Sequence, residues 1–256
     1  MRAFEIIGSI AILQHDASKE ELNEFAQDIL NSQKNVKTVL AKKERIKGRL
    51  RTRKLVYICG EKTKETIHRE NGCLIKLNVE TCYFSPRMSN ERQEVASFVK
   101  GKESVLVLFA GVSPFAVVIA KKNPSCFVCS IELGRECCKY GVENVRLNKL
   151  KNMQVLQGDV KRIVPKLAKM KMKFDRIIMA RPQLKDTFLK EAFSVCKKGT
   201  IIHYHDFVGE KDIQEVFGKI EKEANKLKKK IKMIRVKKIG NIAPYRYRVR
   251  VDFKVV

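Results

Sequence analysis

The sequence is poor in acidic residues. Its 28 Asp and Glu stand against 54 Lys and Arg, which gives a formal net charge of +26. This excess is far larger than solubility requires, so the partner that we expect first is a polyanion, above all a nucleic acid. A general lysine bias of the source organism's proteins is the alternative explanation. The charge therefore indicates a class of partner but no activity.

Long apolar runs and paired metal-ligand motifs are also lacking. The longest apolar stretch, residues 105–120, is interrupted by Gly111 and Pro114 and is shorter than the roughly 20 residues of a membrane span. The N-terminal segment turns polar too early for a secretory signal. Eight scattered cysteines are typical of reduced thiols, and the C-x-x-C of Cys126 and Cys129 has no second ligand pair. We expect a cytoplasmic protein without a membrane or metal partner.

The first 82 residues predict a small β-rich (α+β) domain. Within it, residues 41–54 carry eight Lys or Arg against the single acid Glu44. Arg49, Arg51 and Arg53 alternate, which would place three guanidinium groups on one side of a strand for RNA contact. A solvated strand edge protected by cations is the alternative. The predicted strands of this domain are 4–7, 10–13, 36–40, 55–59 and 73–77.

From residue 83 to residue 256 the pattern alternates between strands and helices. It predicts an α/β fold with a doubly wound, Rossmann-like sheet. A long amphipathic helix with an apolar face from Ile213 to Ile231 should precede a terminal antiparallel pair at 233–237 and 245–255. The other predicted strands are 105–109, 127–131, 153–156, 176–179 and 200–204, and the other predicted helices are 91–99, one from 114, 135–147, 163–170 and 186–196.

Three residues at the ends of successive strands predict an adenosine site. Gly111 allows close backbone approach, Glu132 follows 21 residues later where an acid can bind ribose hydroxyls, and Asp159 could reach an adenine amino group. Helix capping is the alternative for either acid taken alone. The first loop has one glycine rather than G-x-G-x-x-G, so nothing cradles a pyrophosphate. S-adenosyl-L-methionine fits better than a nicotinamide dinucleotide.

Several motifs resemble those of the archaeal and eukaryotic tRNA (guanine37-N1)-methyltransferase family and its wyosine-pathway relatives. They occupy residues 48–72, 80–92, 109–115, 201–205 and 243–255, so the resemblance covers nearly the whole chain. It implies a class I methyltransferase fold, S-adenosyl-L-methionine as cofactor and the tRNA anticodon loop at position 37 as partner. The family's small N-terminal domain for the tRNA elbow is expected to be missing, and we expect a monomer.

The resemblance also implies roles for individual residues. Methyl transfer to guanine N1 needs a base at N1 and stabilisation of charge on O6. Glu91 matches the base, Arg51 matches the residue that steadies O6, and Pro182 lies in the catalytic loop. The residues expected beside the cofactor are Tyr83, Arg87, Phe109, Gly111, Glu132, Leu133, Asp159, Val160 and Ala180, and those expected beside the RNA are Arg49, Arg53, Phe84, Arg92 and Arg181.

The chain departs from the family pattern at three places. The strand-one Asp is Val107 or Leu108, the second loop Gly is Ser113, and residues 180–182 read Ala-Arg-Pro where guanine-N1 members have Asn-Leu-Pro. Archaeal relatives that process guanosine 37 further toward wyosine also depart from the family pattern at this last place. The sequence therefore predicts methylation of N1 of guanosine 37, with C7 of 4-demethylwyosine as an added target. An aminocarboxypropyl transferase, opposed by the retained Asn90-Glu91-Arg92, and a non-catalytic RNA-binding protein are the alternatives.

Overall fold

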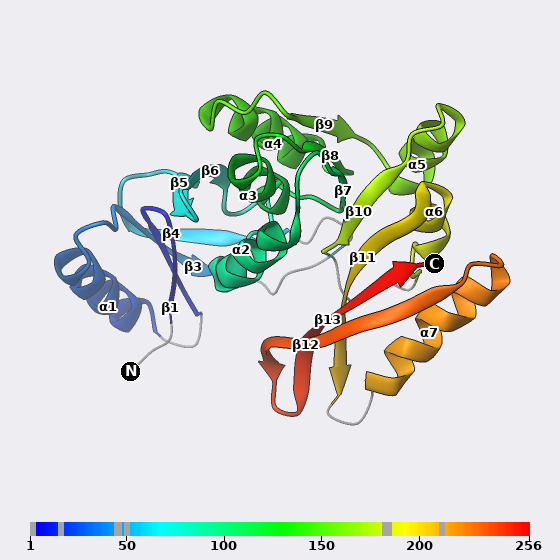
Figure 1. The fold of residues 1–256 in the computed structure, drawn as a ribbon. Coiled ribbons are helices and arrows are strands. Elements are labelled where there is room, and N and C mark those ends of the chain that lie inside the picture. The colour runs from blue at the N-terminus through cyan, green and yellow to red at the C-terminus, as the bar shows by residue number, and fades with distance from the viewer. Residues whose placement is uncertain (1–3, 15–17, 44–47, 49–51, 181–185, 210–212) are drawn as a thin grey trace.

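The computed structural model describes residues 4–14, 18–43, 48, 52–180, 186–209 and 213–256. An N-terminal part with its own small sheet lies beside a larger part built on a seven-stranded sheet (Figure 1). Among the described residues, no helix has both the length and the apolar character needed to cross a membrane.

The N-terminal part is a four-stranded sheet covered by one helix. Its strands β1 (Phe4–Ile7), β2 (Ile10–Leu13), β3 (Thr38–Lys42) and β4 (Leu55–Gly60) pair in that order. The helix α1 (Lys19–Ser32) was not predicted. It begins with a capping box between Ser18 and Glu21 and packs Leu22, Ala26 and Ile29 against Val39. Its signals, a Ser-x-x-Glu start and apolar residues spaced by three and four, were present in the sequence.

A two-stranded hairpin follows, formed by β5 (Glu65–Glu70) and β6 (Cys73–Asn78). Strand β5 was not predicted either, because its sequence ETIHRE is almost entirely polar. Two asparagine side chains hold the backbone of β6. Leu74 N–H donates to Asn148 Oδ1 at 2.9 Å, and Lys76 N–H donates to Asn144 Oδ1 at 2.7 Å. A domain boundary after residue 82 remains a prediction, and these contacts favour one before the hairpin.

The large sheet has the strand order β12-β13-β11-β10-β7-β8-β9. Strands β7 to β11 are parallel, whereas β13 is antiparallel to both β11 and β12. The strands are β7 (Ser104–Leu108), β8 (Phe127–Glu132), β9 (Met153–Gln157), β10 (Phe174–Met179), β11 (Cys196–Gly209), β12 (Ile231–Ala243) and β13 (Arg246–Val255).

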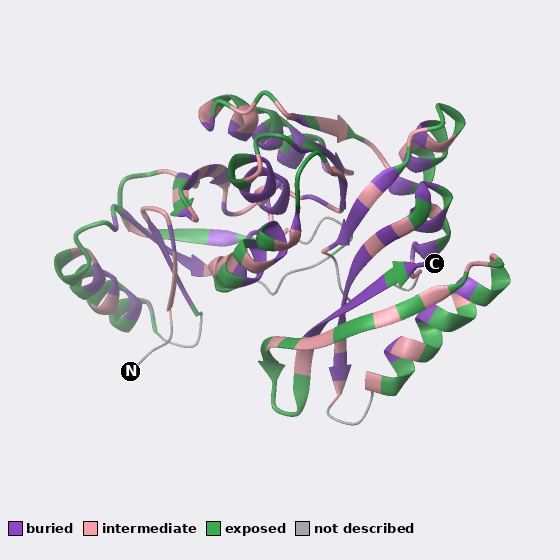
Figure 2. Ribbon diagram, in the orientation of Figure 1, coloured by how far each residue is buried: buried purple, intermediate pink, exposed green. Residues whose placement is uncertain are grey.

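Helices cover both faces of this sheet, so the predicted doubly wound α/β fold is confirmed. Along β7, Val105 and Val107 pack with one set of helices, while Leu106 and Leu108 pack with the other. The central strands are therefore buried on both sides (Figure 2). The helices are α2 (Ser89–Phe98, after the turn η1, Pro86–Met88), α3 (Pro114–Lys122) and α4 (Arg135–Leu147) on the first face, and α5 (Val160–Lys169), α6 (Leu189–Ser194) and α7 (Ile213–Lys226) on the second.

The C-terminal third differs from the predicted boundaries. Helix α7 ends at Lys226, and Ile231 opens strand β12 instead of continuing the helical face. Helix α6 is shorter than predicted. Strand β11 begins earlier, at Cys196, which pairs with Phe174 of β10, and it runs to Gly209 because β13 pairs with it from Ile201 onward. The long strand carries His203 and His205 into the interior, where both are buried.

Candidate active site

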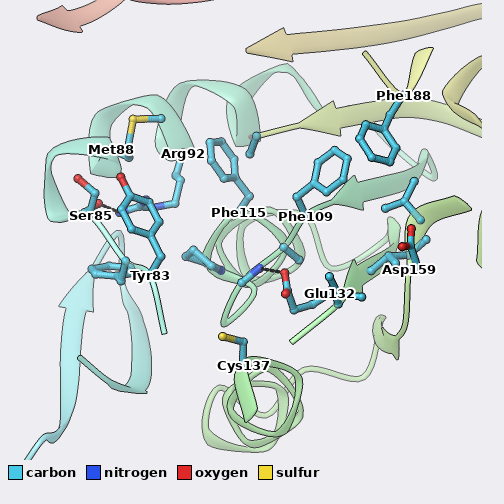
Figure 3. A pocket seen from close by; sticks show the side chains of 18 of the residues that line it. Tyr83, Ser85, Met88, Arg92, Phe109, Phe115, Glu132, Cys137, Asp159 and Phe188 are labelled. Atoms are coloured by element: carbon cyan, nitrogen blue, oxygen red, sulfur yellow. Dashed lines mark hydrogen bonds between the residues drawn. The ribbon is translucent and has the colours of Figure 1, made fainter. Parts of the chain in front are cut away.

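The main cavity lies where the parallel strands β7, β8 and β9 end (Figure 3). It opens to solvent, and its empty space is about 1050 Å³ when the part open to solvent is included. The loops after the three strands form its floor, while the segment before α2 supplies Tyr83, Phe84 and Ser85. In an open α/β sheet, the carboxyl ends of the strands are where ligands bind.

The loop after β7 is shaped by backbone conformations that L-residues rarely adopt. Phe109 has φ +59°, Gly111 φ +58° and Ser113 φ +65°. Such torsions at non-glycine residues store strain and cluster at functional sites. Ser113 stands where the resembling family has glycine, and Gly141 makes room for it, since a Cβ built at Gly141 would lie 2.9 Å from Ser113 Oγ.

The two acids predicted for adenosine lie on the same cavity. Glu132 is fixed at both oxygens: Gly111 N–H donates to Oε2 and Gly134 N–H to Oε1, each at 2.7 Å. Each carboxylate oxygen still has a second lone pair for a ligand hydroxyl. Asp159 is the N-cap of α5 and accepts from Lys161 N–H at 2.9 Å, so the capping alternative holds for this residue. It also lines the cavity.

Most of the residues predicted to contact the cofactor come together here. All line the cavity except Arg87, which lines an adjoining cleft; its contact with the cofactor stays a prediction. Arg49, Arg51, Arg181 and Pro182 lie outside the described residues. The cavity residues that were predicted are Tyr83, Phe109, Gly111, Glu132, Leu133, Asp159, Val160 and Ala180; the sequence did not indicate Phe115, Phe188 or Arg248, which also line it.

The adjoining cleft lies between the N-terminal part and the β12–β13 hairpin. Among the described residues, it is lined by four cations, Lys42, Arg53, Arg87 and Arg248, and by one acid, Glu5; we call it the cationic cleft. It shares Tyr83, Phe84, Ser85, Met88 and Arg248 with the main cavity, so the two are continuous.

Arg53 does not lie on a solvated strand edge, which was the alternative to its predicted RNA contact. Its side chain is buried, its Nε–H donates to the carbonyl oxygen of Val79 at 3.0 Å, and its guanidinium lies 3.7 Å from Glu5. Burial lowers its pKa from the ordinary value. Arg53 therefore links Glu5 in β1 to Val79, which lies in the segment between β6 and α2.

Arg92 lines the main cavity but is already neutralised. It forms a buried bidentate pair with Glu70 and donates to the carbonyl oxygen of Ser85 at 3.1 Å. Its guanidinium also lies 5.0 Å from the ring centre of Phe84. The charge of Arg92 is therefore paired within the protein, and its contact with RNA stays a prediction.

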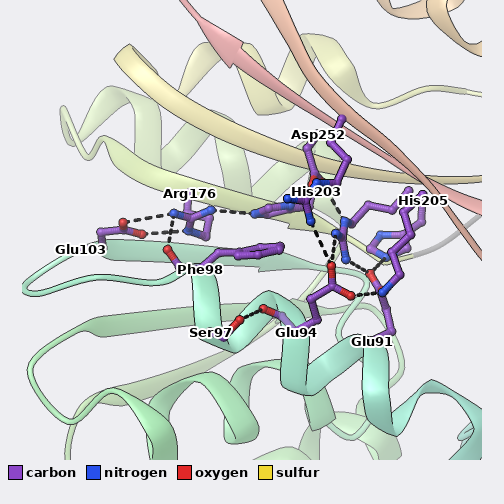
Figure 4. A network of polar contacts seen from close by, with 12 residues as sticks. Glu91, Glu94, Ser97, Phe98, Glu103, Arg176, His203, His205 and Asp252 are labelled. Carbon is purple, nitrogen blue, oxygen red and sulfur yellow. Dashed lines mark hydrogen bonds and ion pairs between the residues drawn. The ribbon is translucent and has the colours of Figure 1, made fainter.

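Glu91 does not line the cavity. Its side chain is 1% exposed and enters a buried polar network between α2, β11 and β13 (Figure 4). Oε1 accepts from Arg250 and from His205 Nε2, the latter at 3.1 Å, while Oε2 has no hydrogen-bond partner among the described residues. Burial would raise the pKa of Glu91, but the hydrogen bond from His205 and the charge of Arg250 lower it to about 2. The carboxylate is therefore ionised.

Arg250 is the centre of this network. Its side chain is fully buried and contacts three acids: Glu91, Glu94 (Nη2 to Oε1, 3.0 Å) and Asp252 (Nε to Oδ1, 2.8 Å). Asp252 in turn accepts from His203 Nδ1 at 2.6 Å. A buried charge needs such partners, because an isolated one would lose its hydration without compensation.

The fold and the cavity define an α/β enzyme that binds a nucleoside-type ligand without a phosphate cradle. Comparison with known proteins narrows this class. The TRM5/TYW2 methyltransferase domain matches residues 66–234, and the TYW2 N-terminal domain matches residues 1–63. The chain belongs to the TRM5/TYW2 methyltransferase family, and the predicted resemblance is confirmed.

Three curated relatives show the range of this family. The tRNA (guanine(37)-N(1))-methyltransferase Trm5b of Pyrococcus abyssi is 40% identical, over 99% of this chain and 74% of its own. The tRNA (guanine(37)-N(1))/4-demethylwyosine(37)-methyltransferase Taw22 of Nanoarchaeum equitans is 32% identical, over 99% and 100%. A tRNA(Phe) (4-demethylwyosine(37)-C(7)) aminocarboxypropyltransferase of Methanocaldococcus jannaschii is 31% identical, over 98% and 97%.

Solved structures agree with the sequence matches. The crystal structure of Trm5b from Pyrococcus abyssi superposes with a TM-score of 0.88 at 38% identity, covering 99% of this chain and 74% of that one. M. jannaschii TYW2, solved in complex with AdoMet, superposes with a TM-score of 0.74 at 26% identity, covering 99% and 100%.

Proposed function

We propose that the protein is an S-adenosyl-L-methionine-dependent tRNA methyltransferase that acts on N1 of guanosine 37. The observation that carries this proposal is the anchored Glu132 carboxylate at the end of β8, in a cavity at the carboxyl edge of a methyltransferase-type sheet. Support comes from the Trm5b and Taw22 relatives, whose names give this nucleotide as their target.

The residues present fit the cofactor. Glu132 offers remaining lone pairs to ribose hydroxyls, and Asp159 stands at the next strand end. Apolar side chains such as Phe109, Ile131 and Val160 enclose the space between them, as an adenine ring needs. The absence of a phosphate-binding loop agrees with a nucleoside that carries no phosphates.

The chemistry needs a methyl donor, an acceptor held in line with it and a proton acceptor. When bound, the cofactor supplies a sulfonium methyl group; the N1–C bond forms as the S–C bond breaks, its electron pair stays on sulfur, and the N1 proton passes to a base. The chain's part is to position both groups and exclude water. Tyr83 and Phe84, which border both the cavity and the cationic cleft, are placed to hold the target base.

We assign the base to Glu91, in a conformation turned toward the cavity. In the resting network its depressed pKa makes it a weak proton acceptor. Leaving Arg250 and His205 would remove the two influences that lower the pKa, so burial would then raise it and increase the basicity. Arg250 would keep Glu94 and Asp252 as partners, which limits the cost of the movement.

Substitution of Glu91 by Gln tests this assignment. Methyl transfer should fall at least 10²-fold, the lower range for general base catalysis, while the affinity for S-adenosylhomocysteine in calorimetry persists. Glu94→Gln is the matched control, because it removes a second carboxylate bound to the same Arg250, three residues along α2. Equal loss of cofactor affinity and transfer in Glu91→Gln would make the residue structural.

The wyosine intermediate is a second candidate substrate. The Taw22 relative is named for both targets, and Ala180 lines the cavity where guanine-N1 members carry Asn. Incubation of the enzyme with tRNA bearing G37, A37 or 4-demethylwyosine at position 37, with label on the methyl or the carboxypropyl carbons of the cofactor, separates the possibilities. Methyl label on G37 alone supports the proposal; carboxypropyl label would favour the chemistry of the M. jannaschii relative, and equal methylation of A37 would refute the target atom.

A further inference from the structure

We propose that Arg248 is a catalytic residue that donates to O6 of the target guanine as negative charge develops there. The inference rests on the proposed function, because it takes N1 of guanosine 37 as the methyl acceptor. No role for Arg248 follows from the sequence motifs, which pointed to Arg51 for this task.

Arg248 lies where the main cavity and the cationic cleft meet. It is in β13, paired with Phe207 on one side and Gly240 on the other, and its guanidinium lies 5.2 Å from the ring centre of Phe207. Of the described residues that line both the main cavity and the cationic cleft, it is the one that carries charge. A base that enters from the cleft and presents N1 to the cavity must pass this side chain.

The guanidinium of Arg248 has an N–H group that is not hydrogen-bonded within the described part of the protein. Its Nε is buried and has no hydrogen-bond partner among the described residues, and no described acid forms an ion pair with it. An unsatisfied buried donor destabilises the protein, and a hydrogen bond to a ligand oxygen would remove that cost. Arg92, which also lines the cavity, is in contrast paired with Glu70 and bonded to the carbonyl oxygen of Ser85.

The chemistry of the acceptor selects O6 as the partner of Arg248. As the N1 proton leaves, negative charge spreads to O6, the atom next to the reacting centre. A donor fixed in a largely desolvated site stabilises such charge without reorganisation. Of the remaining cations of the cleft, Arg53 is held within the protein by Glu5 and the Val79 carbonyl oxygen. Lys42 and Arg87 line the cleft but not the cavity, so we assign them to the nucleotide backbone.

Arg248→Gln, compared with Arg246→Gln, tests the proposal. Arg246 is two residues away in the same strand and exposed, so it controls for the lost charge. With saturating cofactor and G37 transcript, single-turnover transfer should fall about 10²–10³-fold in Arg248→Gln, as for loss of an oxyanion donor. The dissociation constants of S-adenosylhomocysteine and tRNA should change less than about threefold. Arg248→Lys should recover part of the rate.

A spectroscopic readout is independent of turnover. In tRNA carrying 6-thioguanosine at position 37, bound with S-adenosylhomocysteine, the thiobase should ionise at lower pH on wild-type enzyme than on Arg248→Gln. The other charged groups that line the main cavity and the cationic cleft, Glu5, Glu132, Asp159, Lys42, Arg53, Arg87 and Arg92, are the same in both proteins.

Three results would overturn the role of Arg248. Equal rates and equal thiobase ionisation in Arg248→Gln and Arg246→Gln would show that it does nothing at O6. A loss explained by weaker S-adenosylhomocysteine binding would assign Arg248 to the cofactor carboxylate, and a loss explained by weaker tRNA binding with a flatter salt dependence would assign it to a phosphate. Failure of wild-type enzyme to methylate G37 would instead refute the proposed function.

Discussion

Replacing Arg250 by Met should destabilise the fold more than any exposed substitution. The side chain is fully buried and is shared by Glu91, Glu94 and Asp252. Methionine fills a similar elongated space but leaves the acids without their common cation. Removal of one partner from a buried ion pair costs about 3–5 kcal/mol, which for a protein of this size lowers the melting temperature by roughly 6–20 °C.

The depressed pKa of Glu91 accounts for part of this loss. His205 and Arg250 together lower the pKa from the ordinary 4.5 to about 2, which corresponds to about 3 kcal/mol of stability shared between the two partners. Because the folded pKa is depressed, this stability is fully present above pH 4.5 and is lost as the pH falls toward 2. The difference between wild type and Arg250→Met should therefore be largest near neutral pH and shrink below about pH 4.5.

Urea unfolding at several pH values measures this difference directly. Arg246→Met is the control, since an exposed substitution in the same strand should change stability by less than about 0.5 kcal/mol. A loss below 1 kcal/mol for Arg250→Met, or a loss that does not depend on pH, would refute the account of the network as an ionic one.

Three further perturbations probe the site and its support. Glu132→Gln should weaken S-adenosylhomocysteine binding roughly 10- to 100-fold by calorimetry, because a charged acceptor is lost; unchanged affinity would exclude the ribose role. Gly141→Ala should lower both stability and cofactor affinity, and Ser113→Gly in the same chain should restore them, since the added Cβ meets Ser113 Oγ. Arg53→Met should lower the free energy of unfolding while the salt dependence of tRNA binding stays unchanged. A flatter salt dependence in this variant would show that Arg53 contacts an RNA phosphate.

The fold was largely predictable because its signals are local. Apolar strands, the loop around Gly111 and acids at successive strand ends identify the doubly wound sheet and its ligand edge. The unpredicted helix α1 had a capping box and helical spacing that the surrounding β-type runs obscured. Strand β5 could not be predicted from pattern, because its pairing with β6 and the support from Asn144 and Asn148 come from tertiary structure.

The surroundings of the candidate base could not be predicted, because they depend on contacts between distant segments. Glu91 meets His205 and Arg250, which lie 114 and 159 positions away. Nothing in the local sequence distinguishes Arg250 from its neighbours in RYRVRVDF, although one is fully buried and Arg248 borders the cavity. The alternation of arginine in β13 shows only that they share a face of the strand.

The most direct test of the central claim is to identify the modified nucleoside. Wild-type enzyme, S-adenosyl-L-methionine and a G37 tRNA transcript are incubated, and the digested tRNA is analysed by mass spectrometry of fragments that contain position 37. The account predicts 1-methylguanosine at that position and none in the A37 transcript. An aminocarboxypropyl adduct, a methyl group elsewhere in the tRNA, or tRNA binding without any modification would contradict it.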